Sequence, residues 1–177
     1  MEGASRALPA VGMIMRKLVH AVDEQSPLAD AVAFMRERGV PGAPVVRGRT
    51  PVGVLTLAEL IEPGHDGSPD DGYSLYYQLD GDVEPPRPAP GWRPSHVRVG
   101  EVMRPFVLSI EVGANLVQAA NRMLSEGVRR LLVRDGTELV GQISCVDLLS
   151  AFARLFAPEV GLVSEHGGEG GEGAPPG

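Results

Sequence analysis

The stretch GQISCVDLL, Gly141–Leu149, begins like a buried strand and ends like the first turn of a helix. Moved back by 88 positions (141 − 53 = 88), it falls on GVLTLAELI, Gly53–Ile61. The same shift carries residues 11–61 onto residues 99–149 without a gap, and 15 of these 51 paired positions are identical. Because the glycines and the apolar spacing are kept, we interpret the chain as two copies of one supersecondary unit that pack against each other.

Each copy has the same predicted order of elements. A short strand comes first, then a helix with apolar residues at i, i+3, i+4 and i+7, which ends near Gly39 or Gly127. Two strands joined by turn-forming residues follow, and a second helix starts near Thr56 or Ser144, running to about Phe156 in the second copy. The predicted strands are Leu18–Val22, Ala43–Val46 and Val52–Leu55 in the first copy, and Val107–Ile110, Leu131–Arg134 and Leu139–Ile143 in the second. The predicted fold class is α/β (α+β), with two tandem repeats, each strand-helix-strand-strand-helix.

The remaining segments differ in composition from the two repeats. We divide the chain into an N-terminal arm (1–10), repeat 1 (11–62), an acidic Pro/Gly-rich linker or insertion (63–95), repeat 2 (96–157) and an acidic Gly-rich tail expected to be disordered (158–177). The net charge is −7, but residues 63–95 contribute −4 (six acids, two bases) and residues 157–177 another −4, so the rest of the chain is near +1. A nearly neutral folded part need not repel an anionic ligand. It also has no basic stripe for nucleic acid.

The cysteine count and the absence of targeting signals favour a cytoplasmic location. The single cysteine, Cys145, rules out a disulfide framework within the chain. The N-terminus lacks the basic start and long apolar run of a signal peptide, and no uninterrupted apolar run is long enough to span a membrane. We therefore expect a soluble cytoplasmic protein with no membrane partner.

The segment Tyr73–Leu79 interrupts the linker and holds all three tyrosines of the chain. Tyr73, Tyr76 and Tyr77 would share one face of a short helix. This segment is either a helical turn laid over exposed core or a lid or partner-docking patch.

Ser144 and Asp147 allow two interpretations at the start of the last helix. A hydroxyl followed three residues later by an acid is typical of a capping box, and Thr56 with Glu59 fits that pattern too. The same place can bind an anion, because free amides and the helix dipole favour phosphate there. A carboxylate one turn further on can accept hydrogen bonds from two ribose hydroxyls. The two interpretations are compatible if the pair changes partners on binding.

The doubled order of elements, with its Gly-x-x-Thr/Ser-x-x-Asp ending, resembles the CBS domain (cystathionine β-synthase domain), and two copies resemble a CBS pair, or Bateman module. The likeness covers Val11–Ile61 and Val99–Phe156 and includes the V-G-x-h-M openings and Leu139–Gly141. The resemblance implies a pseudo-twofold module with two clefts that bind adenosyl ligands such as AMP, ADP, ATP, NAD or S-adenosylmethionine. It also implies a disc-shaped homodimer that regulates a partner protein.

Site residues follow from the same resemblance. In the second copy it implies ligand contacts at Ser109, Val128, Arg130, Leu131, Gly141, Ser144 and Asp147. In the first copy the matching positions are Val40, Gly42, Ala43, Thr56 and Glu59. There, Glu59 replaces the family's Asp, and Ala21 replaces its first-strand hydroxyl. We therefore expect the second copy's site to be competent and the first to be degenerate or differently selective.

The leading prediction is a regulatory module that senses an adenosyl ligand and needs no cofactor. The first alternative is a ligand-independent dimerisation or adaptor module that uses the fold only to dock a partner. An enzyme ranks lower, because no nucleophile, base and orienting group stand together in a known pattern. The four histidines, His20, His65, His96 and His166, lack metal-ligand spacing.

Overall fold

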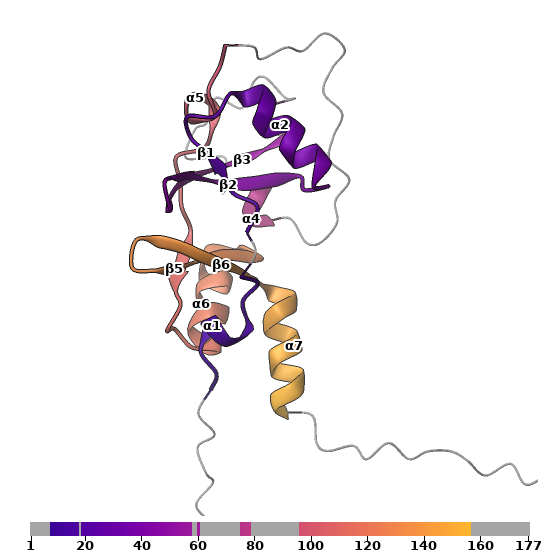
Figure 1. Ribbon diagram of the computed structural model, residues 1–177. Coiled ribbons are helices and arrows are strands. Elements are labelled where there is room, and N and C mark those ends of the chain that lie inside the picture. The colour runs from indigo at the N-terminus through magenta and orange to yellow at the C-terminus, as the bar shows by residue number, and fades with distance from the viewer. Residues whose placement is uncertain (1–7, 18, 58–59, 61–74, 79–95, 157–177) are drawn as a thin grey trace, which may run out of the picture.

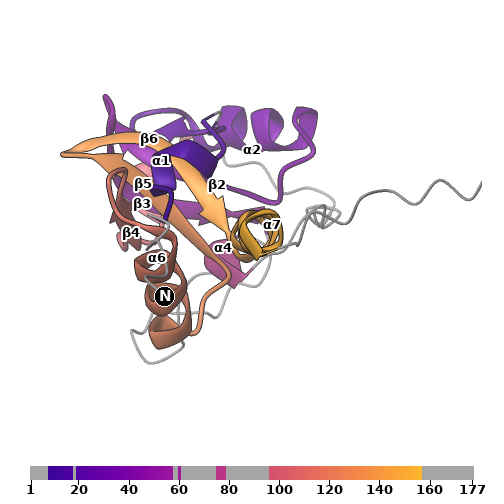
Figure 2. The same cartoon turned by 90° about the horizontal axis from the view of Figure 1, so that it is seen from below.

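The computed structural model describes residues 8–17, 19–57, 60, 75–78 and 96–156. Two three-stranded sheets lie one above the other, and helices α2 and α6 lie on opposite outer sides of them (Figures 1 and 2). The elements of the first half are α1 (Val11–Ile14), β1 (Val22–Asp23), α2 (Leu28–Glu37), β2 (Gly42–Arg47), β3 (Thr50–Thr56) and α4 (Leu75–Gln78). Those of the second half are α5 (Val99–Val102), β4 (Ser109–Glu111), α6 (Leu116–Glu126), β5 (Arg130–Asp135), β6 (Glu138–Ser144) and α7 (Cys145–Phe156).

The two sheets have the same topology. In each, the first strand runs parallel to the second, and the second pairs antiparallel with the third. The pairs Val45↔Gly53 and Val133↔Gly141 are related by the 88-residue shift, and a register irregularity follows each of them. The predicted second and third strands of both copies are therefore confirmed, together with the tandem-repeat fold class.

The predicted first helix of each copy and the second helix of the second copy are confirmed as well, whereas the helix predicted to start near Thr56 falls largely outside the described residues. Helix α6 starts with a capping box, in which Asn115 and Gln118 bond each other's backbone amides at 3.0 and 2.9 Å. It ends at Gly127, whose φ of 63° is readily adopted only by glycine. Gly39 has the same φ just after α2. Leu28, Ala31, Val32 and Met35 are buried, so α2 places its apolar face on the sheet.

The first strand of each copy lies later in the chain than predicted. The structure has β4 at Ser109–Glu111 rather than Val107–Ile110, and β1 at Val22–Asp23 rather than from Leu18, which lies outside the described residues. The reason in the second copy is that the Leu108 amide donates to the Tyr77 hydroxyl at 2.8 Å instead of to a neighbouring strand. A pattern of apolar residues cannot distinguish these two acceptors.

The start of each copy crosses to the other copy. The amides of Val11 and Gly12 donate to the carbonyls of Ala114 and Val112 at 2.7 and 2.9 Å. Arg16 pairs with Gln142 through two backbone hydrogen bonds of 2.9 and 3.0 Å. The contacts expected from the 88-residue shift are also present, namely Val99 with Ser26, Gly100 with Glu24, and Arg104 with Val54. The two copies thus interlock with pseudo-twofold symmetry.

The crossing explains two glycines that both copies keep. A Cβ at Gly141 would lie 2.6 Å from the Met15 sulfur and 2.8 Å from the Arg16 carbonyl oxygen. A Cβ at Gly53 would overlap the Arg104 carbonyl oxygen. Only a glycine lets the crossing segment approach so closely.

Helix α4 is covered by both copies. Tyr76 and Tyr77 are 1% and 0% exposed, and both belong to the larger apolar core, with Val54 of β3 and Leu131 of β5. The prediction of a helical turn laid over core is confirmed for these two tyrosines. Tyr73 and the rest of residues 63–95 lie outside the described residues, except Leu75–Gln78, as do residues 1–7 and 157–177.

Candidate functional site

A pocket of about 450 Å³ opens between the two copies, where β6 gives way to α7. Its volume falls in the range of small-molecule sites. The lining comes from both halves of the chain. It consists of Arg16, Val19, His20, Gly39, Val40, Pro41, Gly42 and Pro44 from the first copy, Tyr76 from α4, and Arg130, Gln142, Ser144, Val146 and Asp147 from the second copy.

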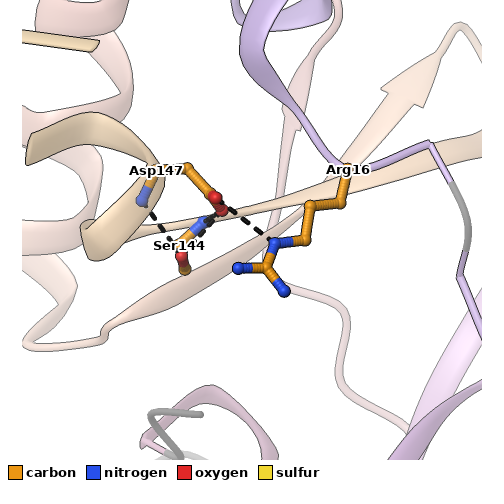
Figure 3. A network of polar contacts seen from close by, with 3 residues as sticks. All are labelled: Arg16, Ser144 and Asp147. Atoms are coloured by element: carbon orange, nitrogen blue, oxygen red, sulfur yellow. Dashed lines mark hydrogen bonds and ion pairs between the residues drawn. The ribbon is translucent and has the colours of Figure 1, made fainter. Parts of the chain in front are cut away.

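Ser144 and Asp147 form a closed polar pair on the pocket wall (Figure 3). The Ser144 amide and hydroxyl both donate to Asp147 Oδ2, at 2.9 and 2.7 Å. The Asp147 amide donates to Ser144 Oγ at 3.3 Å. These reciprocal bonds are a capping box, so the capping interpretation of this pair is confirmed. They also hold the carboxylate in the first turn of α7, on the pocket wall, where a ligand could contact it.

Arg16 reaches the same carboxylate from the other copy. Its Nε lies 3.3 Å from Asp147 Oδ1 (Figure 3), and its side chain is 66% exposed while that of Asp147 is 14% exposed. The backbone pairing with Gln142 fixes the position of Arg16. An exposed pair of this kind contributes little stability, which leaves the guanidinium able to turn toward an anion in the pocket.

Tyr76 and Arg130 close another side of the pocket. The Arg130 guanidinium lies 5.1 Å from the centre of the Tyr76 ring, a cation–π distance. The Tyr76 hydroxyl donates to Gln142 Oε1 at 2.9 Å. Burial raises the pKa of Tyr76, so its hydroxyl stays a neutral donor.

The structure groups the predicted site residues across the copies rather than within them. It brings Ser144, Asp147 and Arg130 together with Val40 and Gly42 around one pocket. The pocket is thus shared between the copies, because the pseudo-twofold arrangement places the end of β6 beside the start of β2. The assignment of ligand contacts to these residues stays a prediction.

The other predicted positions that the structure describes lie outside this lining. Ser109 Oγ accepts a 2.7 Å hydrogen bond from Arg134 Nε on the neighbouring strand. Gly141 packs against Met15, and Thr56 is fully buried. Val128, Leu131 and Ala43 are also buried and do not line the pocket, and Glu59 lies outside the described residues.

Several lining residues were not predicted as site residues. Arg16 had a usable signal, since it is kept as Arg104 in the other copy. His20 carries no metal-ligand spacing in the sequence, yet it is half-buried in the lining, with its ring 6.0 Å from that of Phe34. Tyr76 could not be assigned from sequence, because nothing in the repeat indicates where a segment between the copies will pack.

The pocket has the chemistry of an amphipathic ligand site. Val19, Val40 and Val146 offer apolar surface, while two arginines and one carboxylate stand close by. Among the residues that the structure describes, no three His, Cys, Asp or Glu side chains gather as a metal site. Within the same residues, no helix is both long and apolar enough to cross a bilayer.

The chain belongs to the CBS domain family, since the family model "CBS domain" matches residues 11–64 and 99–154. A search of curated proteins found no match. Among solved structures, the chain is similar to CBSX2 from Arabidopsis thaliana, a CBS-pair protein, at 22% identity and a TM-score of 0.60, covering 86% of this chain and 99% of that one.

Two further structures extend this likeness. CBSX2 in complex with AMP is 25% identical with a TM-score of 0.56, covering 82% of this chain and 97% of that one. Hypoxic Response Protein I with two coordinated zinc ions is 22% identical with a TM-score of 0.59, covering 81% and 98%. Two tandem CBS repeats in a pseudo-twofold arrangement are thus the architecture of this chain.

Proposed function

We propose that this protein is a regulatory module that binds an adenosyl ligand in the pocket between its CBS repeats and modulates a partner protein. The observation that carries the proposal is the meeting of Asp147, Ser144 and Arg16 in one pocket that also has apolar walls. The likeness to a CBS-pair protein in complex with AMP supports the same ligand class.

Each part of the pocket has a role in this proposal. Asp147 accepts hydrogen bonds from the two ribose hydroxyls and gives up its bonds to Ser144 as it does so. Such charge-assisted bonds contribute roughly 1.5–3 kcal/mol each. Arg16 and Arg130 meet the phosphate or another anionic group. The base lies against Val40 and its apolar neighbours.

We also propose that the module self-associates. Val146, Leu149 and Phe156 are 51%, 68% and 71% exposed and follow one side of α7. Apolar side chains gathered along one helix favour a protein contact over solvent. A second copy of the chain is the occupant we expect, which would make the protein a homodimer.

Thermal unfolding against AMP, ADP, ATP, NAD and S-adenosylmethionine tests the ligand. A compound at a hundred times its dissociation constant adds roughly 2.7 kcal/mol of stability, a shift of several degrees for a chain of this size. Asp147→Ala removes the shift, and Asp135→Ala, an exposed acid on the same copy outside the pocket lining, keeps it.

The alternative is a ligand-independent dimerisation or adaptor module. It is favoured by one observation, that Ser144 and Asp147 already satisfy each other as a helix cap. A well-folded protein that shifts with none of the five compounds would contradict the sensor and support the adaptor.

A further inference from the structure

The pseudo-twofold symmetry predicts a second cleft, related to the pocket by the 88-residue shift. Four pocket-lining residues of the first copy are His20, Gly39, Pro41 and Gly42. Their counterparts at +88 are Leu108, Gly127, Arg129 and Arg130. A second ligand in a symmetric module would lie against these four positions.

Helix α4 contacts each of these four positions. The Leu108 amide donates to the Tyr77 hydroxyl at 2.8 Å, and the Arg129 amide donates to the Tyr77 carbonyl at 2.9 Å. Gln78 Nε2 donates to the Gly127 carbonyl at 2.9 Å, and Arg130 lies over the Tyr76 ring. In the second cleft, an aromatic ring and hydrogen-bonding groups of α4 therefore contact the positions whose counterparts in the open pocket would contact a ligand.

Two side chains at the second cleft, Tyr77 and Thr56, are fully buried. Tyr77 is 0% exposed, and its ring packs edge-on against Phe106 at 6.4 Å. Thr56, the counterpart of Ser144, is 0% exposed, whereas Ser144 is half-buried in the pocket wall. Figure 1 shows α4 between the two sheets, where it contacts both β3 and β5.

We propose that α4 is a built-in occupant of the second cleft, with the Tyr77 ring in the place of a ligand's base. The protein then has one open site per chain, and removal of the Tyr77 side chain opens a second site for the same class of ligand. Only the identity of that ligand rests on the proposed function.

Isothermal titration with AMP tests the proposal through stoichiometry. The wild type is expected to bind one AMP per chain and Tyr77→Ala two. Tyr77→Phe is the matched control, because it keeps the ring in the cleft and loses only the hydroxyl, and it is expected to bind one. If Tyr77→Ala does not fold, Tyr77→Val makes the same test, because it removes the ring, keeps an apolar side chain and leaves Tyr76 in the wall of the open pocket.

Each result separates this inference from the proposed function. Two AMP per wild-type chain, or one per chain in both Tyr77→Ala and wild type, would overturn the inference and leave the proposed function standing. Binding by Tyr77→Ala with none by the wild type would support the closed second cleft and contradict the open first site. Binding by neither protein would overturn both.

Discussion

The open pocket and the second cleft that the symmetry predicts come from copies of one sequence unit and yet differ in what lines them. The pocket beside α7 combines Ser144 and Asp147 with Val40 and Gly42. In the second cleft, Thr56, the counterpart of Ser144, is buried, and the Tyr77 hydroxyl accepts a hydrogen bond from the Leu108 amide. The strands keep the same register in both copies. Among the described residues, an element that breaks the symmetry is α4, Leu75–Gln78, which has no counterpart in the repeat.

The largest expected effect compares the two acids that follow the third strands. Asp147→Ala lowers affinity for the ligand at least about tenfold, because a single charge-assisted hydrogen bond of 1.5–3 kcal/mol already exceeds 1.4 kcal/mol. Glu59→Ala is expected to leave the affinity unchanged, since Glu59 is the counterpart of Asp147 under the 88-residue shift and would belong to the second cleft. Titration calorimetry measures both. The comparison would be reversed if Glu59→Ala abolished binding and Asp147→Ala had no effect.

The next effect tests the interlocking of the copies at Gly53 and Gly141. Alanine at either position lowers the free energy of unfolding by about 1–3 kcal/mol, the usual cost of overpacking. Gly53→Ala has the larger effect, because its Cβ would meet the Arg104 carbonyl first, whereas at Gly141 the nearest atom is the flexible Met15 sulfur. Gly113→Ala is the control, since a Cβ there meets nothing within 4 Å. Urea unfolding gives the three values, and equal values at all three positions would contradict the close crossing.

The sequence predicts more of the fold than of the candidate site. The repeat itself predicts the second and third strands and the helices, because apolar spacing and terminating glycines are local signals. It does not predict that Arg16 pairs with Gln142 or that Val40 and Asp147 line one pocket, because both features depend on how one copy crosses the other. The cap at Ser144 was predictable from four residues. The contact of Tyr77 with Leu108 was not, since it joins a segment outside the repeat to one inside it.

A smaller effect concerns the wall that α4 gives to the open pocket. Tyr76→Phe loses the hydrogen bond to Gln142 and lowers the free energy of unfolding by about 0.5–1.5 kcal/mol. A double-mutant cycle with Gln142→Ala isolates the pair, because the effect of Tyr76→Phe shrinks when its partner is absent. Purely additive effects in the cycle would show that the two side chains stabilise the fold independently.

The smallest expected effect is a pH-dependent contribution to stability from an ion pair that is present in the first copy and absent at the matching positions of the second. Glu24 bonds Arg47 through two contacts, one of them from Nη2 at 2.8 Å, and the hydrogen bond from Arg47 lowers the pKa of the Glu24 carboxyl. The counterpart positions in the second copy hold Val112 and Asp135 and cannot form this pair.

A carboxyl whose pKa is lowered by folding stabilises the protein above its unfolded value of about 4.3, and the contribution disappears as pH falls through the lower folded value. The melting temperature of Glu24→Gln is therefore below that of the wild type at pH 7, and the two converge near pH 3. The difference is small because the Arg47 side chain is 72% exposed and water screens the pair. Arg47→Gln is expected to lose stability at pH 7 and converge with the wild type in the same way. A gap that stayed constant between pH 7 and pH 3 would mean that Glu24 acts through packing rather than through its charge.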